Sequence, residues 1–169
     1  MRQILISREY VNPTDFPEGE EDPGYISALE HADNALHERG ELVYALFNSM
    51  GRTEQALLDL MEDHSDDTTE GGYYSNITKI HYQSPFIQTM RVVPELEDWF
   101  FTEGRTTGDS ESIYTEAFGY HLVYFTGEGD IFFELIADDR LRTRDHNEWL
   151  ENLTTGTPRK TAAFILVHL

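Results

Sequence analysis

The stretch EAFGYHLVYFTGEGD, residues 116–130, places a histidine inside an apolar and aromatic run. Because successive side chains of a strand point to opposite faces, His121 shares one face with Val123 and Phe125. The residues between them are also apolar or aromatic, so both faces of this strand are expected to be covered. A histidine in such a strand is either a hydrogen-bonded core residue or part of a functional site. The rest of the sequence has to distinguish these two interpretations.

Other segments with strand character lie on both sides of this stretch. Alternation of side chains predicts an opening strand in RQILIS, with Gln3 and Leu5 on one face and Ile4 and Ile6 on the other. Further β-rich segments are YYSNITKIHY (73–82), SIYTE (112–116) and TAAFILVHL (161–169). The acidic segment 11–24, rich in proline and glycine, is expected to be a solvated loop.

Helical spacing of apolar residues predicts the helices. A long amphipathic helix ending at Gly51 is indicated by Leu29, Ala32, Leu36, Val43, Phe47 and Met50, with Gly40 as a point of break or bend. A second helix, with Thr53 as its N-cap, carries Ala56, Leu57, Leu60 and Met61. A short helix begins at Pro94. A terminal helix is predicted from Phe132, Ile136, Trp149 and Leu153. This order of elements predicts an α+β domain with helices packed on a largely antiparallel sheet.

The composition excludes several classes of function. With 169 residues, of which 39% are hydrophobic, the chain can bury a core. A net charge of -20 repels phosphate backbones and anionic surfaces, so we expect no nucleic-acid partner. No apolar run reaches the roughly 18 residues that span a bilayer, so we expect no membrane insertion. The absence of cysteine excludes thiol nucleophiles, disulfides and cysteine-based zinc sites.

The patterns of familiar catalytic and metal sites are absent. No two histidines have the spacing that places both on one helix face, and neither an EF-hand loop nor a G-x-S-x-G elbow occurs. The acidic clusters EGEED (18–22) and EDHSDD (62–67) are solvated charged loops or, alternatively, weak calcium sites. We therefore expect no cofactor and no metal centre.

Four segments together resemble the parvulin-type peptidyl-prolyl isomerases. They are RQILIS (2–7), HSDDTTEGGYY (64–74), MRVVPELEDWFF (90–101) and EAFGYHLVYF (116–125), in the order and at the separations of that family. The resemblance covers residues 2–126 and implies a small antiparallel sheet wrapped by helices, an FKBP-like arrangement. We expect a parvulin-like domain at 1–128. Residues 129–169 are expected to form a helix and strand extension, packed on it or belonging to an adjoining domain, similar to the tail of exported bacterial foldases.

The resemblance also implies the residues of an isomerase site. His121 matches the histidine of the closing strand, and Asp67 matches the position that holds aspartate or cysteine in the family. Gln3 stands where the family has the histidine of its opening strand, so the usual pair of histidines is broken. Contacts to the proline ring are expected from Tyr74, Ile77, Met90, Val92, Leu96 and Phe118. Each of these six residues could equally belong to the core, and without the resemblance the core is the favoured interpretation.

The resemblance leaves three functional hypotheses. The first is a peptidyl-prolyl isomerase that assists the folding of exported proteins, with activity reduced by Gln3. The second is a non-catalytic chaperone or peptide-binding module of the same fold, and the third is an acidic metal-binding or structural domain. For the first two, the partners are unfolded or extended polypeptides that contain X-Pro bonds. The family type implies an extracytoplasmic location if the chain is excised from an exported precursor.

Overall fold

The computed structural model describes residues 1–80, 82–84, 87–130 and 132–156. Its helices and a three-stranded antiparallel sheet form a mixed α+β fold, as predicted. The chain divides into two compact units, one of Met1–His81 and Thr89–Gly129 and the other of Tyr82–Gln88 and Asp130–Leu169. The second unit thus includes a segment from the middle of the chain, which the sequence did not predict. The strand predicted at 161–169 lies outside the described residues.

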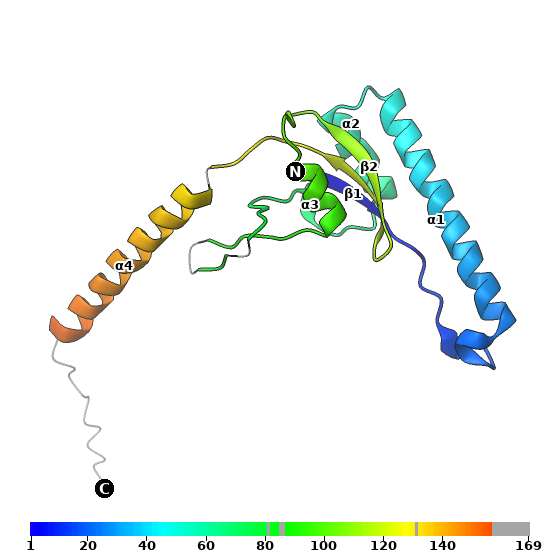
Figure 1. The fold of residues 1–169 in the computed structure, drawn as a ribbon, viewed down its shortest axis with the longest axis horizontal. Helices are drawn as coiled ribbons and strands as arrows, with labels where there is room; N and C mark the ends of the chain where they lie inside the picture. Colours follow the sequence, from blue (N-terminus) through cyan, green and yellow to red (C-terminus); the bar gives the residue numbers. More distant parts are fainter. Residues whose placement is uncertain (81, 85–86, 131, 157–169) are drawn as a thin grey trace, which may run out of the picture. The chain divides into compact units, whose positions relative to one another are not determined.

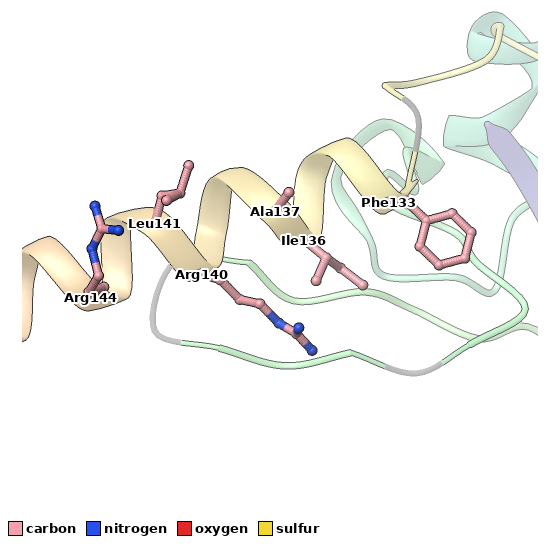
Figure 2. A pocket seen from close by; sticks show the side chains of 6 residues that line it. All are labelled: Phe133, Ile136, Ala137, Arg140, Leu141 and Arg144. Atoms are coloured by element: carbon pink, nitrogen blue, oxygen red, sulfur yellow. The ribbon is translucent and has the colours of Figure 1, made fainter.

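The sheet belongs to the first unit, and its central strand is the one that holds His121. The strands are β1 (Arg2–Ile6), β2 (Ser110–Thr115) and β3 (Gly119–Tyr124), in the order β1-β3-β2 (Figure 1). Both neighbours run antiparallel to β3, with Leu5 of β1 and Ile113 of β2 opposite His121. The central position of β3 explains why its residues are apolar on both faces.

Two helices cover one face of this sheet. Helix α1 (Pro23–Ser49) begins at Asp22, whose carboxylate accepts a hydrogen bond from Gly24 N at 2.7 Å. Helix α2 (Glu54–His64) has the predicted cap, because Thr53 Oγ1 accepts a hydrogen bond from Ala56 N at 3.1 Å. Both helices bury apolar residues against β1 and β3 in a cluster formed by Ile4, Ile6, Leu36, Val43, Phe47, Ala56, Leu57, Leu60, Leu122 and Tyr124. The predicted helical spacing is therefore confirmed for the residues that face the sheet.

Gly40 does not break α1, and the helix runs through it from Pro23 to Ser49. The glycine is buried, and a Cβ atom at this position would lie 2.6 Å from the ring of Tyr120. The expected break was wrong because the need for a small residue here comes from packing against β3. The loop before α1 is largely exposed and contains the 3-10 turns η1 (Pro13–Asp15) and η2 (Gly19–Glu21).

The opposite face of the sheet packs against the short helix α3 (Pro94–Phe100), which starts at the predicted proline. Its buried cluster consists of Met1, Leu96, Trp99, Phe100 and Val123. Partly buried hydrophobic residues from several other segments pack against this cluster, namely Tyr74, Ile77, Val92, Val93, Ile113 and Phe125. This face of the sheet also carries His121, since Val123 lies two residues further along the same strand.

The β-rich segment predicted at 73–82 does not form a strand within its described residues. Tyr73 makes an isolated bridge with Arg2, and Ile77 makes another with Met90. Between them Asn76 has a φ of 56°, a left-handed conformation that interrupts an extended chain. A 3-10 turn, η3 (Glu70–Gly72), precedes the segment. Residue 81 lies outside the described part of the chain.

The second unit is built around the predicted terminal helix α4 (Phe132–Gly156). Asp139, buried on this helix, accepts hydrogen bonds from Tyr82 Oη and Ser84 Oγ, each at 2.6 Å. These bonds lower the pKa of Asp139, the one from Ser84 having the larger effect. Tyr82 and Ser84 are thereby attached to α4. Among the described residues, no helix is long and apolar enough to cross a membrane.

Candidate functional site

A chain of hydrogen bonds connects the three polar residues that the sequence singled out. Gln3 Nε2 donates to Asp67 Oδ2 at 3.0 Å, and Gln3 Oε1 lies 3.2 Å from His121 Nδ1. These residues come from β1, from the loop after α2 and from β3. The amide of Gln3 therefore stands between a carboxylate and an imidazole and contacts both.

The direction of these hydrogen bonds determines the tautomer of His121. An amide oxygen only accepts hydrogen bonds, so the proton must lie on His121 Nδ1. The other ring nitrogen, Nε2, lies 3.1 Å from Thr115 Oγ1 on β2. In the neutral ring Nε2 accepts a hydrogen bond from this hydroxyl group. Both nitrogens of the buried ring are thus partnered, and its orientation is fixed from two sides.

Burial favours the neutral form of the His121 ring more strongly than nearby carboxylates favour its protonated form. The side chain is 4% exposed, and burial lowers its pKa below 6.5, although Glu95 and Asp67 oppose this change. Gln3 is similarly covered, with 7% exposure. Neither residue is therefore open to solvent at the site.

Asp67 is the charged end of the chain of hydrogen bonds. Burial tends to raise its pKa, but hydrogen bonds from Tyr74, Gln3 and Thr69 outweigh burial and lower it below 3.8. Tyr74 Oη donates to Asp67 Oδ2 at 2.5 Å, and Thr69 N donates to Oδ1 at 2.9 Å. Burial, followed by this bond to Asp67, raises the pKa of the Tyr74 hydroxyl. At neutral pH the pair is therefore a carboxylate and a phenol.

The loop from Ser65 to Gly72 is anchored on β1, which positions Asp67. Asp66 N donates to Leu5 O at 2.7 Å, and the Asp66 carboxylate accepts from Ser7 N at 2.8 Å. Gly72 lies so close to β1 that a Cβ atom would be 2.2 Å from Gln3 O, and its φ is 53°. A side chain at this position would separate the loop from the strand. The glycine thus permits the approach that brings Asp67 to Gln3.

The hydrogen bonds that connect His121, Gln3 and Asp67 form a polar chain, and Tyr74 connects this polar chain to the apolar cluster that includes residues of α3. Its ring packs against this cluster together with Ile77 and Val92, around buried Leu96. Met90 forms a bridge with Ile77 and is 41% exposed. The structure therefore brings five of the six residues expected at a proline site into one neighbourhood.

Phe118, the sixth of these residues, lies at the turn between β2 and β3. Its ring meets the ring of His121 edge to face, with centroids 6.3 Å apart. The side chain is 49% exposed, so it covers the buried histidine while presenting its outer side to solvent. Phe118 is thus next to the polar chain and apart from the cluster of Tyr74, Ile77 and Leu96.

Two members of the polar chain, Thr115 and Thr69, were not predicted from the sequence. Thr115 is buried and partners His121, while Thr69 Oγ1 lies 2.9 Å from Tyr74 Oη. The strand register carries a signal for Thr115, since an antiparallel turn from β2 to β3 brings it beside His121. Thr69 has no such signal, because its role depends on the path of the loop.

The acidic clusters do not converge on a metal site. Within the described ranges, no group of three or more His, Asp or Glu side chains is arranged to hold a metal ion. The carboxylates of Asp66 and Asp67 point to different partners, Arg39 with Ser7 and Tyr74 with Gln3 respectively. The two carboxylates therefore bind different protein groups and do not face a shared ion position.

Comparison of the chain with protein-family models, with curated proteins and with solved structures finds no match.

Proposed function

We propose that this chain is a parvulin-like peptidyl-prolyl isomerase that acts on extended polypeptides containing X-Pro bonds. The observation that carries the proposal is the convergence of Gln3, Asp67 and His121. They are brought together by hydrogen bonds that span 64 and 118 residues of sequence. The resemblance requires these three positions to meet, and nothing in their local sequence does. By the same resemblance, we propose clients among exported proteins.

The adjoining apolar residues support a binding site for a proline ring. Tyr74 belongs both to the polar chain, through Asp67, and to the cluster around Leu96. A proline ring held against the partly exposed Tyr74 and Ile77, with Leu96 buried behind them, would place its preceding carbonyl within reach of the Asp67 end of the chain. The exposed side chain of Met90 would widen the apolar contact.

The chemistry needs no covalent step, because the barrier of about 18–20 kcal/mol comes from amide resonance. Resonance puts negative charge on the carbonyl oxygen, and twisting the bond removes part of it. A carboxylate near this oxygen repels the planar form more than the twisted form. The Asp67 carboxylate would therefore lower the barrier by favouring the transition state over the ground state.

His121 and Gln3 are positioning residues in this mechanism, because both are buried. Gln3 holds the Asp67 carboxylate by one hydrogen bond and is itself oriented by His121. A glutamine cannot titrate near neutral pH, but its amide bridges the same two partners that an imidazole could bridge. Gln3→His is therefore expected to preserve or raise the rate, whereas His121→Ala should lower it.

The test is the rate of cis-trans exchange of a short Ala-Pro peptide, measured by exchange NMR with the full chain. Replacing Asp67 with Asn removes the charge and is expected to lower the catalysed rate about ten- to hundredfold, equivalent to roughly 1.4–2.8 kcal/mol. The matched control is Asp66→Asn, since Asp66 is the adjacent carboxylate and binds Ser7 and Arg39 instead. No catalysed exchange at high protein concentration would overturn the isomerase proposal, as would equal effects of the two substitutions.

A second candidate function is a peptide-holding module without catalysis. The exposure of Met90 and of Phe118 favours it, because apolar surface is available at both residues while His121 is buried. This candidate predicts saturable binding of proline-containing peptides with no increase in the exchange rate. The same NMR titration measures both quantities.

A further inference from the structure

A second concave surface lies next to the polar chain and is not used by the proposed mechanism. It is an open groove of about 390 Å³ in the first unit. Its walls come from the end of β1 with the residues after it, the start of α1, and the β2–β3 turn. Apolar and aromatic contacts along it are supplied by Leu5, Tyr10, Tyr25, Leu29 and Phe118. Such a lining suits an extended peptide segment more than a small polar ligand.

The groove adjoins the buried histidine of the proposed isomerase site. Phe118 lines the groove and packs on the His121 ring, and Leu5 is the register partner of His121 in β1. At the other end of β1, Tyr74 N donates to Met1 O at 2.8 Å. From Met1 to Leu5 an extended chain advances about 3.3 Å per residue, so the two sites are about four residues apart.

The charges along the groove are predominantly negative. Glu9 and Glu116 both line it, and neither forms a salt bridge within the described ranges of the chain. Arg8 also lines it, but its guanidinium is paired with Asp33 at 2.8 Å. With a net charge of -20, the rest of the chain adds to the attraction for a cation.

We propose that this groove binds a lysine- or arginine-bearing stretch of the same polypeptide whose proline occupies the isomerase site. The basic residue would lie within about four residues of the proline, since this is the spacing along β1. Its aliphatic stem would pack on Tyr10 and Phe118 while its charged end reaches Glu9 or Glu116. This inference deepens the proposed function and rests on it for the position of the proline.

The test uses three peptides that are identical except for the residue four positions from one proline on each side, which is lysine, glutamine or glutamate. Each is titrated into the full chain and followed by backbone NMR shifts at low and high salt. We expect the lysine peptide to bind about three- to tenfold more tightly than the glutamate peptide at low salt. The difference should shrink at high salt, and the largest shifts should include residues 116–119.

Substitution of the groove carboxylates makes the test specific. The double variant Glu9→Gln with Glu116→Gln should abolish most of the preference for lysine. Its control, Glu62→Gln with Asp63→Asn, makes the same charge change on α2 and should retain the preference. Equal binding of the lysine and glutamate peptides would overturn the inference, as would loss of the preference in both double variants.

The exchange rate measured on the glutamine peptide separates failure of this inference from failure of the isomerase proposal. Catalysed exchange without any charge preference would support the isomerase proposal and contradict the proposed role of the groove. Tighter binding of the lysine peptide with shifts at 116–119, but without catalysed exchange, would support the groove as a site for basic segments and contradict the isomerase proposal.

Discussion

The two faces of the sheet are both buried, but they are buried in different ways. On the face covered by α1 and α2, the packed side chains are apolar, with Phe47, Leu57 and Ile4 fully enclosed. On the face covered by α3, apolar packing around Val123 adjoins the buried polar groups of Gln3 and His121. One strand, β3, contributes to both faces through alternating residues. The same backbone therefore supports a purely apolar core and a polar chain.

This difference indicates which interactions contribute most to the free energy of unfolding. Burying an apolar side chain contributes about 1.5–3 kcal/mol, whereas a buried hydrogen bond contributes only about 0.5–1.5 kcal/mol net. A buried polar residue is also costly if it loses a partner. The α1 and α2 face should thus dominate the free energy of unfolding. On the other face, the hydrogen bonds of Gln3 and His121 are expected to add little net stability to that of the apolar cluster around Val123, which is consistent with a functional reason for these two residues.

The largest effect is expected on the apolar face. Phe47→Ala should lower the free energy of unfolding by about 3–5 kcal/mol, because the ring is 0% exposed and its removal leaves a cavity. The control is Leu42→Ala on the same helix, where the side chain is 53% exposed and the expected change is about 0.5 kcal/mol or less. Urea denaturation followed by circular dichroism measures both. Similar losses at the two positions would break the assignment of stability to this face.

An intermediate effect is expected when the polar chain is cut. Gln3→Leu should cost about 1–3 kcal/mol because it leaves His121 Nδ1 and one bond of Asp67 without a partner. If His121 is replaced with leucine as well, no donor remains unpartnered on β3, and the Thr115 hydroxyl can donate its proton to Gly119 O, 3.3 Å from Oγ1. The double variant should therefore cost less than the sum of the single variants. A double-mutant cycle by urea denaturation measures this coupling. Strict additivity would mean that the two side chains do not act together.

Much of the apolar face was predictable because its signals are local. Spacing near 3.6 residues identified Leu36, Val43 and Phe47, and the cap at Thr53 depends on the three residues that follow it. Gly40 shows where such signals end. Helix propensity alone predicts a weak point there, but the ring of Tyr120, eighty positions away in the chain, occupies the space beside it. Tertiary packing, which a local pattern does not contain, decided the role of that residue.

The candidate site was less predictable because it depends on contacts between distant segments. The sequence nominated Gln3, Asp67 and His121 only through a resemblance, and their hydrogen bonds require the loop at 65–72 to dock on β1. The attachment of Tyr82 and Ser84 to Asp139 had no signal at all, since a tyrosine and a serine more than fifty positions before an aspartate form no recognisable pattern. The segment at 73–80 was wrongly expected to be a strand for a related reason: Asn76 turns the chain, and strand propensity does not register that turn.

The smallest effect is the dependence of stability on pH that His121 should produce. Burial lowers the pKa of His121 below 6.5, whereas the charges of Glu95 and Asp67 act in the opposite direction. As pH falls through about 6.5, the unfolded chain binds a proton at this ring before the folded chain does. The free energy of unfolding should therefore decrease with falling pH until the folded pKa is passed, and His121 should add no pH dependence above about pH 7.

His121→Gln removes the titrating ring but keeps hydrogen-bonding capacity, so the difference in unfolding free energy between the parent chain and this variant should shrink as pH falls from about 7 to about 5. An NMR titration of the ring gives the folded pKa independently. A difference that grows toward low pH would mean that the protonated ring is favoured by the fold, and the assignment of a neutral His121, held between Gln3 and Thr115, would then be wrong.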